Sequence, residues 1–352
     1  MRGSAAGESA IPESRTRVRL EPRQVDGLVR AALGSDARVA HAKPLGGGTF
    51  NACWSVALAD GRALVLKVAP PPDLPLLGYE QELLRTEVDF YARAARAGVP
   101  VPSVVGADFA RRAIASDYFL MTSIAGLPLA QARRRISRQA LRGLRAELGG
   151  VVARLADVRG EFFGYAPPAV KTRAPTWRAA FGAMLARILE DAERLGVALP
   201  RPAPELAALA AACGPALDQV ATPRLVHFDL WDGNVLVDLS GDRPRLAALI
   251  DGERAFWGDP LAELASLALF GEIERDADFL RGYAEASGRE LAFAPAERQR
   301  ILLAQLYLYL LMRVEPATRG SGGLLGFAIQ RLVSRSLRRV LRRLDAELGR
   351  GR

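Results

Sequence analysis

The stretch that decides the architecture of this chain is residues 226–251, VHFDLWDGNVLVDLSGDRPRLAALID. It contains two apolar runs, 235–239 and 245–250, separated by the turn-forming residues SGDRP, and this pattern predicts an antiparallel hairpin. Asn234 begins the first strand and Asp251 follows the second. We therefore expect these two side chains at the same open end of the hairpin.

Asp229 precedes the hairpin on a glycine-containing loop and can face the same space. An amide oxygen and a carboxylate brought together, as in Asn234 and Asp251, suit Mg²⁺, a hard cation that prefers oxygen ligands and substrate phosphates. A further carboxylate could accept the proton of an attacking hydroxyl. Each residue alone would be a turn cap or a strand-edge residue, but the ordered set predicts a phosphoryl-transfer site.

The first third of the chain contains the parts that a nucleotide site would need. Residues 46–48 are Gly-Gly-Gly, and the apolar runs 51–58 and 62–69 after them are separated by Asp60-Gly61, which predicts a second hairpin. A glycine turn between strands can cover nucleotide phosphates, although any glycine run can equally be a hairpin turn.

Lys67 interrupts the apolar strand LVLKV, in a chain with only three lysines among its 48 basic residues. A lysine in this context indicates a buried point charge, with an exposed strand edge as the alternative. We expect its partner to be Glu87 on a helix over residues 79–97, because an apolar stripe runs beside it; Glu80 and Glu82 remain rivals.

The chain's 352 residues are 50% hydrophobic, enough for two lobes. We expect a disordered leader at 1–18, a sheet-rich lobe at 19–126 and a mainly helical lobe at 127–352. Expected elements include helices at 21–33 and through much of 130–218, a strand at 117–124, and a buried helix at 301–312.

HFDLWDGN matches the H-x-D-x-x-x-x-N pattern of the aminoglycoside phosphotransferase and fructosamine kinase superfamily, which shares the protein-kinase fold. IDGERAFWGDPLAEL resembles that family's metal-binding segment, and GGGTFN its glycine loop. The resemblance implies an α+β, bilobal, protein-kinase-like fold, with a small antiparallel sheet and one key helix in the first lobe. Phe228 departs from the family pattern, where glycine is usual.

By matching positions, the resemblance implies that Asp229 is the catalytic base and that Asn234 and Asp251 are the Mg²⁺ ligands. It implies a structural role for His227, which would hold the catalytic loop in place. It implies transfer of the γ-phosphoryl group of ATP to a hydroxyl. The residues expected around the nucleotide are Gly47, Gly48, Thr49, Asn51, Lys67, Glu87 and the backbone from Thr122 to Ile124.

The acceptor is expected to be a small hydroxylated molecule. An aminoglycoside-like or other antibiotic would make the chain a resistance enzyme, and an amino sugar or fructosamine-type metabolite is the alternative. A cationic acceptor would need carboxylates near Asp229, and an exposed aromatic ring could stack on a sugar. The candidates are Trp231, Asp232, Glu253 and Asp259, together with Phe256, Trp257 and the acidic residues Glu272, Glu274, Asp276 and Asp278.

Other classes of protein fit less well. A protein kinase would need a long activation segment and an APE motif, neither of which follows Asp251. A non-catalytic pseudokinase would be expected to lose Lys67, Asp229 or Asp251.

The net charge of +9 raises the question of nucleic acid, but the basic run 331–343 has helical spacing and no aromatic residues for base stacking. We expect a terminal helix with a solvated basic face, and neither a nucleic-acid nor a membrane partner. No apolar run approaches the roughly 20 residues of a membrane span. The two distant cysteines and the absence of a signal peptide favour the cytoplasm.

Overall fold

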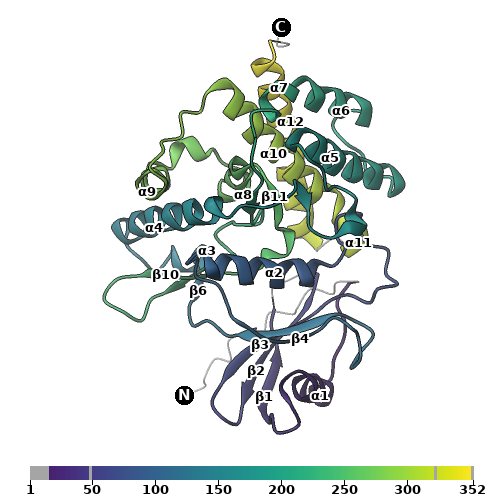
Figure 1. The fold of residues 1–352 in the computed structure, drawn as a ribbon, viewed down its shortest axis with the longest axis vertical. Helices are drawn as coiled ribbons and strands as arrows, with labels where there is room; N and C mark the ends of the chain where they lie inside the picture. The colour runs from purple at the N-terminus through teal and green to yellow at the C-terminus, as the bar shows by residue number, and fades with distance from the viewer. Residues whose placement is uncertain (1–15, 47–49, 321–322, 350–352) are drawn as a thin grey trace.

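The computed structural model describes residues 16–46, 50–320 and 323–349. Most of the expected leader and the predicted phosphate-loop residues Gly47, Gly48 and Thr49 lie outside these ranges. Figure 1 shows a small sheet-rich lobe, with helix α1 at its edge, beneath a larger lobe made mainly of helices. The chain therefore has the expected α+β, bilobal architecture.

The small lobe is a five-stranded antiparallel sheet with the order β1-β2-β3-β5-β4. Along β2 buried and half-buried residues alternate, because successive side chains of a strand point to opposite faces. Helix α1 (Pro22–Leu33) buries Val25, Leu28 and Val29 in the core of this lobe. The strands are β1 (Val39–Pro44), β2 (Ala52–Leu58), β3 (Ala63–Val68), β4 (Val104–Asp108) and β5 (Tyr118–Thr122).

Helix α2 (Leu83–Arg96) lies between the sheet and the helical lobe. It begins at Leu83, four residues later than the predicted start at Tyr79. The reason is local: the Glu80 carboxylate accepts the Leu77 N–H at 2.8 Å in a turn, and Glu82 has a φ of +53°. These two acids therefore lie before the helix.

The large lobe is built around helix α10, whose residues from Ile301 to Leu311 are all buried. This agrees with the core helix predicted for the same stretch. Helices α4 and α9 pack closely, and Gly149 and Gly282 leave no room for a Cβ between them. The helices are α3 (Leu129–Ala132), α4 (Arg138–Asp157), α5 (Trp177–Arg194), α6 (Ala203–Ala212), α7 (Gly214–Leu217), α8 (Glu263–Leu267), α9 (Ala277–Ser287), α10 (Pro295–Val314), α11 (Pro316–Arg319) and α12 (Gly323–Glu347).

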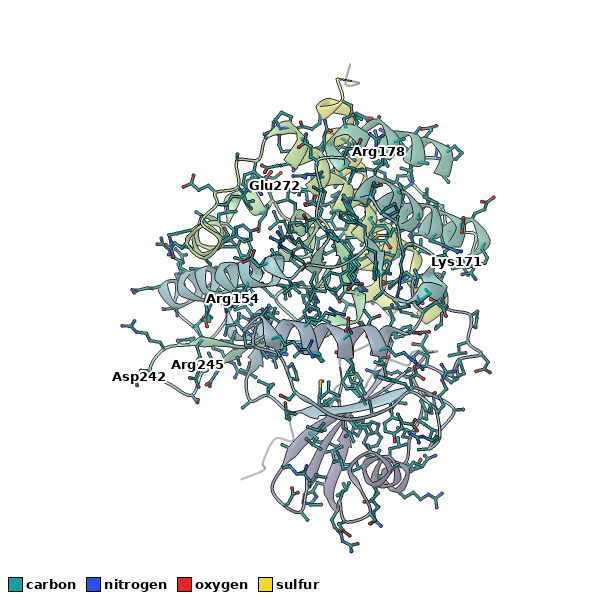
Figure 2. All side chains as sticks on the ribbon, viewed as in Figure 1. Arg154, Lys171, Arg178, Asp242, Arg245 and Glu272 are labelled. Atoms are coloured by element: carbon teal, nitrogen blue, oxygen red, sulfur yellow. The ribbon has the colours of Figure 1, made fainter. Side chains whose placement is uncertain are left out.

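The predicted hairpin is present as β9 (Val235–Asp238) and β10 (Arg245–Leu249), and Val235 pairs with Leu249 at its open end. Its turn, with Asp242, projects from the side of the molecule (Figure 2). The short strand β6 (Leu127–Pro128) extends this sheet. A second small sheet contains β7 (Gly164–Tyr165), β8 (Arg224–Val226) and β11 (Phe256–Gly258), with β11 in the centre.

Helix α12 carries the basic run of the C-terminal region. Its apolar stripe, including Val333, Leu337 and Val340, is buried, while Arg331 and Arg335 are exposed. This is the solvated basic face expected from the sequence. Within the described ranges, no helix combines the length and apolar character that a membrane crossing requires.

Candidate active site

Lys67 on β3 is the centre of a buried ion-pair cluster between the lobes. Its Nζ lies 2.6 Å from Glu87 Oε2 on α2, 2.7 Å from Asp251 Oδ1 and 3.9 Å from Glu253 Oε2. Burial alone would lower the pKa of Lys67, but the three carboxylates together raise it above its ordinary value. The lysine is therefore charged, and Glu87 is its helical partner.

The carboxylates outnumber the cations in this cluster. Oxygen atoms of Glu87, Asp251 and Glu253 all lie within 4.8 Å of one another, and burial together with Asp251 raises the pKa of Glu253 to about 8. Asn51 Nδ2 donates to Glu253 Oε2 at 2.5 Å, while the buried Asn51 Oδ1 has no hydrogen-bond partner among the described residues. We expected Glu253 in the acceptor pocket; in the structure its carboxylate faces Asn51 and Lys67.

Tyr91 joins helix α2 to the metal-ligand candidate Asp251. Its hydroxyl donates to Glu87 Oε1 at 2.6 Å, one helical turn away, and accepts the Asp251 N–H at 3.0 Å. The helix can approach this closely because the next residue is Gly252, where an added Cβ would lie 2.4 Å from the Phe90 ring. From the sequence, Tyr91 was counted only as part of the apolar stripe beside Glu87, although its spacing from Glu87 also indicated the hydrogen bond.

Asp229 lies on the catalytic-loop candidate with 21% of its side chain exposed. Burial raises its pKa to about 7; Asp251 adds to the shift and Arg254, 3.5 Å away, opposes it. A carboxylate with this pKa can accept a proton near neutral pH. Asn234 holds the loop in place, since its Nδ2 donates to the Asp229 main-chain oxygen at 2.8 Å.

Two residues of the site have left-handed backbones, Phe228 with a φ of +62° and Asp251 with a φ of +67°. Glycine adopts this region without the steric cost that a Cβ introduces. The conformation explains why glycine is usual at the position of Phe228 in the resembling family. In this chain the Phe228 ring is fully buried, with its centroid 5.0 Å from that of Phe256 and 5.7 Å from that of Tyr307.

His227 is completely buried and connects the catalytic loop to the end of β10. Its Nε2 lies 3.0 Å from the Ile250 carbonyl oxygen, and its Nδ1 accepts the Asp229 N–H at 3.2 Å. Burial lowers the pKa of His227 to about 4. The imidazole is therefore neutral at pH 7, and the hydrogen-bond network assigns its proton to Nε2.

Helix α8 supplies two residues that the sequence analysis missed. The Glu263 carboxylate accepts the N–H groups of His227 and Phe228, at 2.6 and 3.2 Å, and Ser266 Oγ accepts that of Leu230 at 3.0 Å. These contacts satisfy buried backbone donors of the loop that presents Asp229. No local pattern in the sequence indicates them.

At the expected hinge, strand β5 ends at Thr122. The N–H of Thr122 donates to the Ser103 oxygen and that of Ser123 to the Ala63 oxygen, both at 2.9 Å. The sheet therefore already uses these two donors, and Ile124 follows beyond the strand.

The predicted acceptor-pocket residues have different environments. Trp231 is 41% exposed, whereas Phe256 and Trp257 belong to the core. Asp259 is also buried; its Oδ1 accepts the Leu261 N–H at 3.1 Å and its Oδ2 lies 3.4 Å from Arg300 Nε. Asp259, which we expected in the acceptor pocket, therefore caps a short helix in the structure.

The remaining acidic candidates all lie within 4 Å of arginine nitrogens. Asp232 is 2.9 Å from Arg133 and 3.3 Å from Arg145. Every member of the acidic run is paired in the same way. The pairs are Glu272 with Arg275 and Arg343, Glu274 with Arg343, Asp276 with Arg145, and Asp278 with Arg142 and Arg281.

The two lobes and the charged residues at their junction have a kinase-like arrangement. Residues 41–301 match the model of the phosphotransferase enzyme family, and the chain belongs to that family. It is 39% identical over 89 residues to the probable ketoamine kinase of Lactiplantibacillus plantarum, an alignment covering 25% of this chain and 28% of the relative. The chain thus matches just over a quarter of that relative's length.

Solved structures show the same fold. One, provisionally identified as a fructosamine-3-kinase from Thermobifida fusca, is 25% identical with a TM-score of 0.65, over 90% of this chain and 98% of the other. Another is an aminoglycoside phosphotransferase in a ternary complex with ADP and hygromycin B. It is 19% identical with a TM-score of 0.55, over 89% of this chain and 95% of the other.

Proposed function

We propose that this chain transfers the γ-phosphoryl group of Mg·ATP to a hydroxyl of a small ketoamine of the fructosamine type. The observation that carries the reaction is the convergence of Lys67, Asp229, Asn234 and Asp251 at the junction of the lobes. In this proposal residues 19–126 bind the nucleotide, with Ile124 facing the adenine, and residues 127–352 bind the acceptor.

Asp229 accepts the proton of the attacking hydroxyl, because its partly exposed carboxylate has a pKa of about 7. Lys67, held by Glu87, contacts the nucleotide phosphates. His227 and Asn234 keep the loop in the shape that presents Asp229. The family resemblance implies that Gly47, Gly48 and Thr49, which lie outside the described ranges, contact the phosphates.

The residues present also fit a divalent cation. Asn234 and Asp251 supply oxygen ligands, and the three carboxylates of the cluster face a single lysine, so a cation would offset surplus negative charge. When bound, Mg²⁺ would neutralise charge on the β- and γ-phosphates.

The charge around the site favours a ketoamine over a polycationic antibiotic. Several amino groups on one acceptor would require several free carboxylates, but Asp232, Asp259 and the acidic run already contact arginines. A ketoamine carries few positive charges and does not require several free carboxylates for binding. The similarity to a probable ketoamine kinase supports the same choice.

An aminoglycoside-type antibiotic is the second candidate. The exposed indole of Trp231, two residues after Asp229, offers a face on which a sugar ring can stack. An acceptor of this class would have to displace arginines from the acidic residues, which costs binding energy.

The test is incubation with Mg·ATP and either fructosyl-lysine or kanamycin, followed by ADP release and product mass. We expect fructosyl-lysine to gain one phosphate, and Asp229→Asn to abolish this gain. Phosphorylation of kanamycin alone would select the second candidate. Absence of Mg·ATP binding in a thermal-shift assay would overturn the proposed reaction itself.

A further inference from the structure

A buried row of charged side chains with alternating sign begins at Asp229. Arg254 NH1 lies 3.5 Å from Asp229 Oδ1, and Arg254 NH2 donates to Glu315 Oε1 at 2.8 Å. Arg319 NH1 is 3.5 Å from Glu315 Oε2, and two nitrogens of Arg319 donate to Glu80 Oε1 at 2.5 and 3.0 Å. The row therefore runs Asp229, Arg254, Glu315, Arg319, Glu80.

The row holds three acids and two arginines, so the positive charges do not neutralise all three carboxylates. Glu315 is well compensated, since it contacts both arginines and accepts the Tyr79 hydroxyl at 2.6 Å. Glu80 at the far end has the two short contacts with Arg319. Asp229 has a single contact in the row, at 3.5 Å, and is the acid held least closely by an arginine.

Arg254 is the group for which the two carboxylates compete. Its guanidinium is closer to Glu315 than to Asp229, at 2.8 against 3.5 Å, and its buried Nε has no hydrogen-bond partner among the described residues. A tight pair between Arg254 and Asp229 would occupy the oxygen that must receive a proton. Such a pair would also make the carboxylate a weaker base.

We propose that Glu315 is a positioning residue that holds Arg254 away from Asp229 and so keeps the Asp229 carboxylate free to accept the proton of the acceptor hydroxyl, and that Arg319 limits this hold by partly neutralising Glu315. This inference rests on the proposed function of Asp229. Both residues lie beyond residue 301, where the match to the family ends; Glu315 joins α10 to α11, and Arg319 is the last residue of α11. They are therefore a feature of this chain's C-terminal segment.

Opposite effects on Asp229 follow from the signs of the two charges. Removing the charge of Glu315 removes a repulsion and releases Arg254 towards Asp229, which lowers the pKa of Asp229. Removing the charge of Arg319 leaves the carboxylate of Glu315 less neutralised. The additional negative charge near Asp229 disfavours its ionised form and raises the pKa of Asp229. The other charged groups acting on Asp229, namely Asp251 and Glu263, stay unchanged in both cases.

The experiment is carbon-13 NMR titration of the full chain labelled with side-chain-carboxyl aspartate, with the Asp229 signal identified by its loss in Asp229→Asn. We expect the midpoint to fall by about one pH unit in Glu315→Gln and to rise by about one in Arg319→Gln. Arg319→Lys keeps the charge and should titrate near wild type. The matched control is Glu297→Gln, a buried acid paired with Arg289 at 2.9 Å, and it should not shift the midpoint.

Shifts in the same direction, or no shift in either variant, would overturn the inference. If one variant fails to fold, the other still tests the inference: the midpoint must fall in Glu315→Gln or rise in Arg319→Gln, and the opposite sign would overturn it. The titration needs neither acceptor nor nucleotide, so its result is separate from the acceptor assay. An unreactive wild-type protein would contradict the proposed function, while opposite shifts would still establish the roles of Glu315 and Arg319.

Discussion

Lys67 Nζ and Asp251 Oδ1 lie 2.7 Å apart, although 184 residues separate them in the chain. The contact joins strand β3 of the small lobe to the residue that follows the β9–β10 hairpin of the large one. Since Glu87 shares the same ammonium group, one buried lysine ties three distant segments together. Removing the lysine should therefore affect both folding and nucleotide binding.

Lys67→Met should lower the free energy of unfolding by about 3–5 kcal/mol, because it leaves the fully buried Glu87 without its cation. Chemical denaturation measures this loss. The double variant Lys67→Met/Glu87→Gln should recover part of the stability, since it removes the unpaired charge as well. A double variant whose loss equals the sum of the two single losses would show that the pair is not coupled.

The pH dependence of turnover should report the raised pKa of Asp229. The carboxylate is active as a base when deprotonated, and its pKa is about 7. We expect kcat/KM to fall about tenfold per pH unit below this value, measured with the acceptor identified by the assay above. An acid limb near pH 4, the range of an ordinary aspartate, would contradict the assignment.

The same pKa has a consequence for stability. The pKa of Asp229 is higher in the folded than in the unfolded protein, so ionising this carboxyl lowers the free energy of unfolding. The loss is complete above about pH 7 and absent below about pH 4, where the carboxyl is protonated in both states. Asp229→Asn should therefore raise the free energy of unfolding by about 1–3 kcal/mol at pH 8 and by little at pH 4. Equal gains at both pH values in urea unfolding would argue against a raised pKa.

Asp251→Asn should weaken binding of Mg·ADP much more than binding of ADP in the presence of EDTA. The substitution removes a charged oxygen ligand but leaves the side chain's shape. Isothermal titration calorimetry measures both affinities, with Glu297→Gln as a control that lies outside the site. If the preference for Mg·ADP over free ADP is unchanged in Asp251→Asn, this residue does not hold the metal.

His227 should stay neutral throughout the physiological pH range. Its pKa is lowered to about 4, below the unfolded value of about 6.5, so the protein should lose stability as pH falls between these values. Nitrogen-15 NMR of the imidazoles tests this directly, because the chain has only two histidines and the other, His41, is exposed. Titration of His227 near pH 6.5 would refute the buried, neutral assignment.

Features with local or periodic signals were predictable from the sequence alone. Apolar runs and a turn segment determined the β9–β10 hairpin, so Asn234 and Asp251 could be placed at one end. A lysine within an apolar strand and an acid on the following helix identified the pair of Lys67 and Glu87. The family resemblance then supplied the bilobal fold around them.

The partners of the remaining charges depended on tertiary structure. Tyr79 and Glu315 are 236 residues apart in the chain, yet their oxygens meet at 2.6 Å, and nothing in the spacing between them indicates this. The same is true of Glu253, whose buried carboxylate faces Asn51 across 202 residues.

The physical reason is that a sequence pattern reports which face of an element is buried, because burial follows the period of the helix or strand. It does not report which opposite charge the packing of distant elements brings within 3–4 Å. The sequence thus determined the lobes, the hairpin and the central residues of the site. Only the tertiary structure decided that the acidic run is neutralised by arginines, and that Glu315 and Arg319 stand beside Arg254 in the row that begins at Asp229.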